Sequence, residues 1–316
     1  MDVSIWFWVG FHAVIFVLLA IDLGVFNREA HVISLKEAGI FTAVWITTAL
    51  LFNLGLFLVA GRQPGLEFLT GYLIEYSLSI DNIFVFVLIF SAFSVPGKYQ
   101  HRVLFWGILG ALILRGALIA TGSILIEQFS WILYLFGAFL VFAGWRMLRS
   151  DGEEHVDLEN NPILKLVRRF IPLTDKYHGQ KFIVQENGRR VATPLFMVLI
   201  LVEVTDVMFA LDSIPAIFAI TQDPFIVYTS NVFAILGLRS LYFLLAGIVD
   251  KFVFLRYGLA AVLTFVGLKL LLAEVFHIPN VLSLGVIVVA LAASVIASLI
   301  YDQRKSEVAD TPHQPE

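Results

Sequence analysis

The chain has 316 residues, of which 59% are hydrophobic and 15% are charged, and its mean hydropathy is +0.88. Soluble domains carry about a quarter charged residues, so this composition predicts a polytopic membrane protein rather than two soluble domains. The net charge of -4 excludes a generally basic nucleic-acid-binding surface. The absence of cysteine excludes disulfides, thiol redox catalysis, Fe–S clusters and thiolate metal sites, so a metal would need oxygen or imidazole ligands.

Nine apolar segments are long enough to cross a hydrocarbon core, which takes about 20 helical residues. In chain order they are residues 4–26, 38–60, 66–94, 102–122, 129–149, 194–220, 225–249, 253–273 and 279–301. The first has no basic leader and no small-residue cleavage site, so we expect a membrane span rather than a signal peptide. The predicted fold class is an all-α polytopic membrane protein, with a transmembrane transporter domain over residues 1–305 and a disordered cytoplasmic tail over 306–316.

Basic residues collect in every second connection between the predicted spans. Lysines and arginines follow spans one, three, five, seven and nine, whereas the even connections contain only Arg62. Because cytoplasmic loops carry the excess of lysine and arginine, this pattern predicts a periplasmic N-terminus and a cytoplasmic C-terminus.

The connection over residues 150–193 is the one sizeable polar segment between spans. The Asn161-Pro162 pair predicts the start of a short helix at the membrane surface, with an apolar stripe beside basic residues. The residues on either side of the Glu186-Asn187-Gly188 turn predict a small β-hairpin. We expect the basic face of this loop to contact solvent or lipid headgroups rather than a protein partner.

The sequence contains an internal repeat. Three pairs of stretches match in the same order: 75–83 with 206–214, 107–115 with 231–239, and 142–148 with 265–271. The repeats therefore cover about residues 66–149 and 194–273, with three spans each. Because three is odd, the second unit would cross the membrane in the opposite sense. Inverted repeats of this kind are typical of secondary transporters, whose site lies near the bilayer midplane.

Ionisable residues inside the predicted spans indicate a cation site. The carboxylates are Asp22, Glu75, Asp81, Glu203, Asp206 and Asp212, and the cations are Arg115, Arg239 and Lys269. Each charge at the bilayer centre costs about 2.5–3.5 kcal/mol on the lenient insertion scale. The five acids of the third and sixth spans, offset by two arginines, leave a formal charge of -3. A divalent cation and one proton would neutralise it, so we expect Arg115 and Arg239 to be counter-ions rather than ligands or gates.

The spacing of these acids supports this interpretation. Glu203 and Asp206 share a helix face, while Asp212 lies about 120° further around an ideal helix. Pro215 favours a bend in the same helix and frees the carbonyl of Leu211. The predicted metal ligands are Glu75, Asp81, Glu203, Asp206 and Asp212, and the possible secondary ligands are Asn82, Ser213 and Asp22. Asp22 either joins the site or pairs locally.

Residues 75–82 and 203–216 resemble the signature motifs of the TerC family of integral membrane proteins. Residues 223–227 and 229–239 are similar to its Alx-like, alkali-inducible branch. The resemblance extends over nearly the whole chain. It implies an inner-membrane protein associated with manganese export, and it also carries the older descriptions of tellurium resistance and redox modulation. The five predicted acidic ligands all match the family motifs.

We therefore expect an inner-membrane Mn²⁺ exporter driven by proton antiport. It would have no enzymatic activity and no prosthetic group, and its partners would be the lipid bilayer, the metal ion and protons. Oxygen ligands suit Mn²⁺, Mg²⁺ or Ca²⁺ better than Cu⁺ or Zn²⁺, and the resemblance selects Mn²⁺. The main alternative is a non-transporting membrane stress factor, of the redox-modulator or tellurium-resistance type. An intramembrane aspartyl protease is a third alternative, but the chain lacks the GxGD element.

Overall fold

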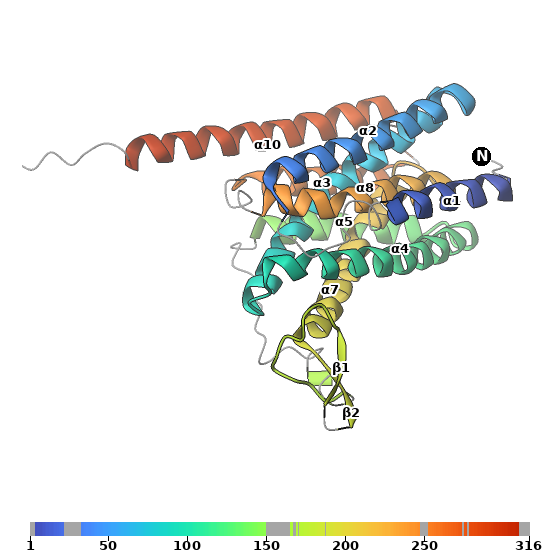
Figure 1. Cartoon of the computed structure of the whole chain (residues 1–316). Helices are drawn as coiled ribbons and strands as arrows, with labels where there is room; N and C mark the ends of the chain where they lie inside the picture. Colours follow the sequence, from blue (N-terminus) through green and yellow to red (C-terminus); the bar gives the residue numbers. More distant parts are fainter. Residues whose placement is uncertain are drawn as a thin grey trace, which may run out of the picture.

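The computed structural model describes residues 4–21, 33–149, 165–166, 169, 171–186, 188–246, 252–273, 275–276 and 278–309, without the side chains of residues 21, 81 and 304–309. Nine helices and one hairpin lie within these ranges (Figure 1). The helices are α1 (Ile5–Ile21), α2 (Leu35–Val59), α3 (Arg62–Ala92), α4 (Gly97–Gln128), α5 (Ile132–Arg149), α7 (Pro194–Phe218), α8 (Pro224–Leu245), α9 (Leu255–Leu271) and α10 (Asn280–Ala309). The strands are β1 (Ile183–Glu186) and β2 (Arg189–Ala192).

Each of the nine predicted spans overlaps one of these helices, and α4 and α10 extend well beyond the predicted ends. Seven of them, in the described part of the chain, are long and apolar enough to cross a membrane: α2, α3, α4, α5, α7, α8 and α10. The other two, α1 and α9, have 17 residues each, which corresponds to about 25 Å at 1.5 Å per residue. The prediction of an all-α, multi-pass membrane protein is confirmed.

Helices α3, α4, α7 and α8 form the centre of the bundle, since α3 and α4 each pack against both α7 and α8. Helix α8 is buried along almost its whole length, whereas α2 and α10 expose most of theirs. Apolar side chains on the outer helices, such as Leu58 on α2 and Val289 on α10, are more than half exposed. This distribution fits a bundle surrounded by lipid, with its polar residues directed inward.

Glycines allow α5 and α9 to pack backbone to backbone. A Cβ atom on Gly267 would lie 2.7 Å from the carbonyl oxygen of Gly137, and one on Gly144 would lie 2.8 Å from that of Ala260. Small residues permit this kind of close approach between membrane helices. Gly144 and Gly267 occupy equivalent positions in the predicted repeat, and the inverted-repeat relationship itself stays a prediction.

Helix α7 is one uninterrupted α-helix that ends three residues after Pro215. The proline therefore lies in the last turn, beyond both Asp206 and Asp212. The carbonyl that it frees, that of Leu211, lies between the two acids, but the helix continues through this turn, so no break brings the acids together.

The predicted hairpin is confirmed. Strands β1 and β2 pair antiparallel, with Ile183 opposite Ala192 and Glu186 opposite Arg189. Gly188 in the turn has a φ of +77°, a conformation that glycine adopts readily. The hairpin projects from the helical body (Figure 1). Most of the expected surface helix before it, around Asn161-Pro162, lies outside the described residues.

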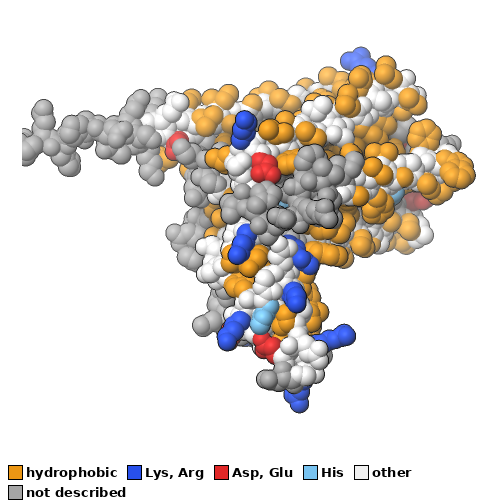
Figure 2. Space-filling view, viewed as in Figure 1, with side chains coloured by type: hydrophobic (Ala, Val, Ile, Leu, Met, Phe, Trp, Pro, Cys, Tyr) orange, Lys and Arg blue, Asp and Glu red, His pale blue; other side chains and the backbone are white. Residues whose placement is uncertain are grey.

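The hairpin segment is attached to the bundle end that carries the connection between α3 and α4. The hydroxyl of Tyr177 donates a hydrogen bond to the carbonyl of Phe93 at 2.6 Å, and Arg102 Nη1 donates to Gln180 Oε1 at 3.0 Å. In Figure 2 the blue lysine and arginine side chains gather around this projecting segment, while orange hydrophobic side chains cover much of the helical body. Helix α10 continues to Ala309, into the segment predicted as a tail.

Candidate functional site

A buried arginine joins three helices at the centre of the bundle. Arg115 of α4 is 1% exposed. Its Nε donates to Asp206 Oδ2 at 2.9 Å and its Nη2 donates to Asp206 Oδ1 at 2.8 Å. Its Nη1 donates to Glu75 Oε1 on α3 and, at 3.4 Å, to Ser213 Oγ on α7. The guanidinium thus makes a two-bond pair with one carboxylate and a further ion pair with a second, which is a strong geometry for charge-assisted hydrogen bonds.

Helix geometry explains which polar residues of α7 reach this arginine. Asp206 and Ser213 are seven residues apart, about two helical turns, so they lie on one face. Asp212 lies on a different face and is half-buried, and the positive charge of Arg146 on α5 acts on it. The structure therefore does not place Asp212 beside Glu75 and Asp206.

Glu203 lies one turn before Asp206 and packs against α4. A Cβ atom on Gly110 would collide with the Glu203 carboxylate, so the glycine makes room for this side chain. The charge of Asp206 acts on Glu203, as expected for two acids on one helix face. Glu203 Oε2 is buried and has no hydrogen-bond partner among the described residues.

One face of α3 carries further buried oxygen atoms without partners. Glu75, Ser79 and Asn82 follow the i, i+4, i+7 spacing of a single helix face, and each is 1% exposed. Within the described ranges, Glu75 Oε2, Ser79 Oγ and Asn82 Oδ1 accept no hydrogen bond. Because buried polar atoms nearly always have a hydrogen-bond partner, we expect water or a bound ion to contact these three oxygens.

Arg239 of α8, the repeat counterpart of Arg115, is 5% exposed. It lines a cavity of about 10 Å³ together with Asp206, Val202 and Ile235. This volume is about what one water molecule needs. The cavity brings the second predicted counter-ion close to the cluster around Arg115.

The predicted ligand set is only partly drawn together. Glu75 and Asp206 meet at Arg115, Glu203 lies one turn before Asp206, and Asp212 lies on another face, where the charge of Arg146 acts on it. The Asp81 side chain and the whole of Asp22 lie outside the described residues. In the part of the chain that the structure describes, no three His, Asp or Glu side chains are grouped so as to hold a metal ion. The five-acid metal site therefore stays a prediction.

One buried carboxylate is absent from the predicted set. Glu67 lies in the second turn of α3 and is 8% exposed. It falls inside the predicted third span, so its charge within an apolar segment was the signal that could have identified it. Glu67 is connected to Lys269, the third predicted intramembrane cation, in a pocket away from Arg115.

Comparison of the sequence with known proteins identifies a family that it matches. A family described as "Integral membrane protein TerC family" matches residues 60–306. The membrane protein STKORF319 of Myxococcus xanthus is 52% identical over 306 residues, covering 96% of each chain. A protein of Escherichia coli (strain K12), whose name gives it the proposed role of membrane-bound redox modulator Alx, is 50% identical over 89% of this chain and 90% of its own. No solved structure matches the chain.

Proposed function

The chain belongs to the TerC family of integral membrane proteins, and on this premise we propose that it exports divalent cations across the inner membrane, with Mn²⁺ as substrate and protons as the exchanged ion. The bilayer surrounds the described helices, and the central cluster on α3, α4 and α7 is the proposed route. The periplasmic N-terminus and cytoplasmic C-terminus of this proposal rest on the distribution of basic residues in the connections.

The observation that carries the proposal is the set of buried oxygens without partners. Glu75, Asn82 and Glu203 each contribute one oxygen that accepts no hydrogen bond within the described residues. Carboxylate and amide oxygens are the ligands preferred by hard cations such as Mn²⁺ and Mg²⁺. Burying polar groups at this depth is costly unless they serve a substrate pathway or pair with one another. These oxygens have no partner among the described residues, which favours a substrate pathway.

Proton coupling follows from the same chemistry. A carboxylate must lose its proton to hold a cation, so protons and metal compete for the site. An acidic exterior would protonate the outward-open site and release the ion, while the cytoplasm would favour deprotonation and loading. Arg115 would hold Glu75 and Asp206 when no cation is bound, which prevents two unpaired carboxylates from meeting in the bilayer.

The test is Mn²⁺ flux from proteoliposomes containing the purified protein or its Glu203→Gln variant. Arg115 is hydrogen-bonded to Asp206 and Glu75 and not to Glu203, so the substitution leaves these two ion pairs in place. We expect the wild-type protein to move Mn²⁺ and the variant to lose most of the flux. The matched control is Glu127→Gln, since Glu127 is an exposed glutamate at the end of α4. Equal flux from all three proteins would place the route elsewhere.

The second candidate is a non-transporting membrane stress factor, which the redox-modulator name of the relatives favours. Without cysteine, a thiol-based redox role has no residue to perform it. A purified protein that moves no Mn²⁺, while its gene still protects cells against metal or alkaline stress, would favour this candidate over export.

A further inference from the structure

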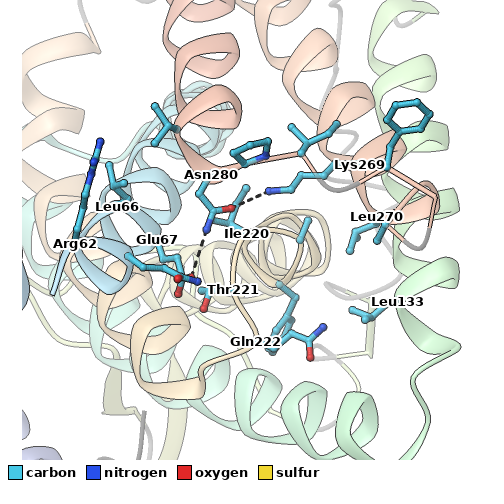
Figure 3. A pocket seen from close by; sticks show the side chains of 18 residues that line it. Arg62, Leu66, Glu67, Leu133, Ile220, Thr221, Gln222, Lys269, Leu270 and Asn280 are labelled. Carbon is cyan, nitrogen blue, oxygen red and sulfur yellow. Dashed lines mark hydrogen bonds between the residues drawn. The ribbon is translucent and has the colours of Figure 1, made fainter. Parts of the chain in front are cut away.

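A pocket of about 600 Å³ lies where α3 begins and α7 ends, at the bundle end opposite the hairpin. Figure 3 shows it from close by. Its walls come from the first turns of α3, the end of α7 and its following turn, the end of α9, and the start of α10. This volume lies within the range of small-molecule sites, which combine mostly apolar walls with a few polar groups. Leu66, Phe218 and Leu270 supply apolar wall, and Glu67, Lys269 and Asn280 are the polar groups of its interior. The exposed Arg62 and the polar residues Gln63, Thr221 and Gln222 line the same pocket.

The asparagine separates two buried, oppositely charged side chains. Lys269 Nζ donates to Asn280 Oδ1 at 3.0 Å and to Ser283 Oγ at 3.0 Å. Asn280 Nδ2 donates to Glu67 Oε1 at 3.4 Å, and Gln63 Nε2 donates to the same oxygen at 2.9 Å. Figure 3 shows Lys269, Asn280 and Glu67 in this order along the pocket. The lysine and the glutamate are 9% and 8% exposed.

Both charges keep unused hydrogen-bonding capacity. An ammonium has three donors, and Lys269 uses two of them on neutral acceptors. Gln63 and Asn280 both donate to Glu67 Oε1, so Oε2 remains able to accept a hydrogen bond from a ligand. No direct ion pair joins the two side chains in the described part of the molecule, although buried charges are normally paired. The pocket therefore presents one buried positive and one buried negative group that a ligand could pair with separately, and the exposed Arg62 adds a second positive group.

This arrangement selects against ions of a single charge. A bare divalent cation needs several oxygen ligands of negative charge, and here one carboxylate stands in a chain of hydrogen bonds with an ammonium. A simple anion would satisfy Lys269 but approach Glu67 with like charge. A molecule that carries a primary ammonium and an anionic group satisfies both sides.

Part of the mouth of the pocket, beside α10, is apolar. Phe276 and Val281 line it and are 68% and 52% exposed. Val281 begins the exposed face of α10, which continues through Val288 and Val289. A ligand with a hydrocarbon chain could place its polar end in the pocket and lay the chain along α10.

We propose that this pocket binds phosphoethanolamine chemistry, with the phosphate on Lys269 and the primary ammonium on Glu67. The source would be the headgroup of a phospholipid or the free compound. The site is separate from the cluster around Arg115, so its existence does not depend on the proposed export.

The test is calorimetric titration of the purified, delipidated protein in detergent. The ligands are short-chain phosphatidylethanolamine, phosphatidylcholine, phosphatidylglycerol and free phosphoethanolamine. We expect phosphatidylethanolamine to bind about tenfold or more tightly than phosphatidylcholine, whose quaternary ammonium has no N–H for Glu67, and than phosphatidylglycerol, which has no ammonium. Glu67→Gln and Lys269→Gln should each weaken binding by a similar factor, and Glu127→Gln should leave it unchanged.

Binding of both the lipid and free phosphoethanolamine would support the site with a soluble source, and binding of the lipid alone would support it with a membrane source. Equal affinity for the three lipids would overturn the proposal, as would phosphatidylethanolamine binding that both substitutions leave unchanged. If a variant does not fold, the headgroup series on the wild-type protein decides by itself.

Discussion

Arg115 and Asp206 form an ion pair with two hydrogen bonds, of 2.9 and 2.8 Å, between α4 and α7 in the interior of the bundle. Both residues are at least 97% buried. Because the same guanidinium also binds Glu75, the arginine holds three central helices through charged contacts. Arg115 therefore links the helices, and its positive charge would lie next to any cation bound by Glu75 or Asp206.

Replacing the arginine should strongly destabilise the protein. Arg115→Gln removes the counter-ion that two buried carboxylates share, and breaking a buried pair in this way costs about 3–5 kcal/mol. Arg190→Gln, on the exposed face of the hairpin, should change stability by less than about 0.5 kcal/mol. Unfolding in detergent micelles, followed by circular dichroism, measures both. Equal stability of the two variants would show that the Arg115 pairs contribute nothing.

A methyl group at Gly110 should disturb the site without unfolding the bundle. The colliding atoms belong to the carboxylate of Glu203, the free end of a flexible side chain, so the side chain can move away. Gly110→Ala should therefore fold normally while its Mn²⁺ flux falls to the level of Glu203→Gln. Gly55→Ala is the control, because a Cβ there meets no atom within 4 Å. Full flux from Gly110→Ala would mean that the position of Glu203 is unimportant for transport.

In the close contact between α5 and α9, an added methyl group should lower the stability of the protein. Gly267→Ala pushes a methyl group toward the backbone oxygen of Gly137, which cannot move without shifting the helix. Overpacking of this kind costs about 1–3 kcal/mol, so the variant should unfold more easily than Gly285→Ala, whose new Cβ has open space. Thermal denaturation in detergent compares the two. Equal denaturation midpoints would contradict the tight packing of the helix pair.

Hydrophobic runs and turn chemistry were sufficient to predict the framework from the sequence. Each apolar segment contains a helix because a run of about 20 apolar residues stays in the bilayer only when its backbone hydrogen bonds are made internally. The hairpin followed from strand-forming residues on both sides of Gly188. In contrast, the extent of α10 to Ala309 was underestimated, since polar residues can continue a helix beyond the membrane.

The composition of the central site was harder to predict because it depends on how helices rotate against one another. Helical spacing brought Glu203 and Asp206 together and separated Asp212, as their angular offset indicates. The convergence of Glu75 and Asp206 on Arg115 requires three helices at fixed rotations, which no local pattern encodes. Glu67 was missed because its partner Asn280, and Lys269 which binds that asparagine, come from α10 and α9, more than 200 residues away in the chain.

The predicted orientation can be tested with single cysteines, because the chain has none of its own. Lys176 is exposed near the hairpin, and Glu127 is exposed at the end of α4. In intact cells a membrane-impermeant maleimide should label Glu127→Cys and leave Lys176→Cys unlabelled until the membrane is opened. External labelling of Lys176→Cys would reverse the orientation predicted from the basic residues.

The central claim is that Mn²⁺ leaves in exchange for protons, and the direct measurement is the pH inside proteoliposomes during Mn²⁺ efflux at a clamped membrane voltage. With Mn²⁺ loaded inside and none outside, the account predicts that the lumen acidifies as the metal leaves, and that Glu203→Gln abolishes both signals. Efflux of Mn²⁺ at a constant lumenal pH would contradict proton antiport and indicate a channel-like path instead.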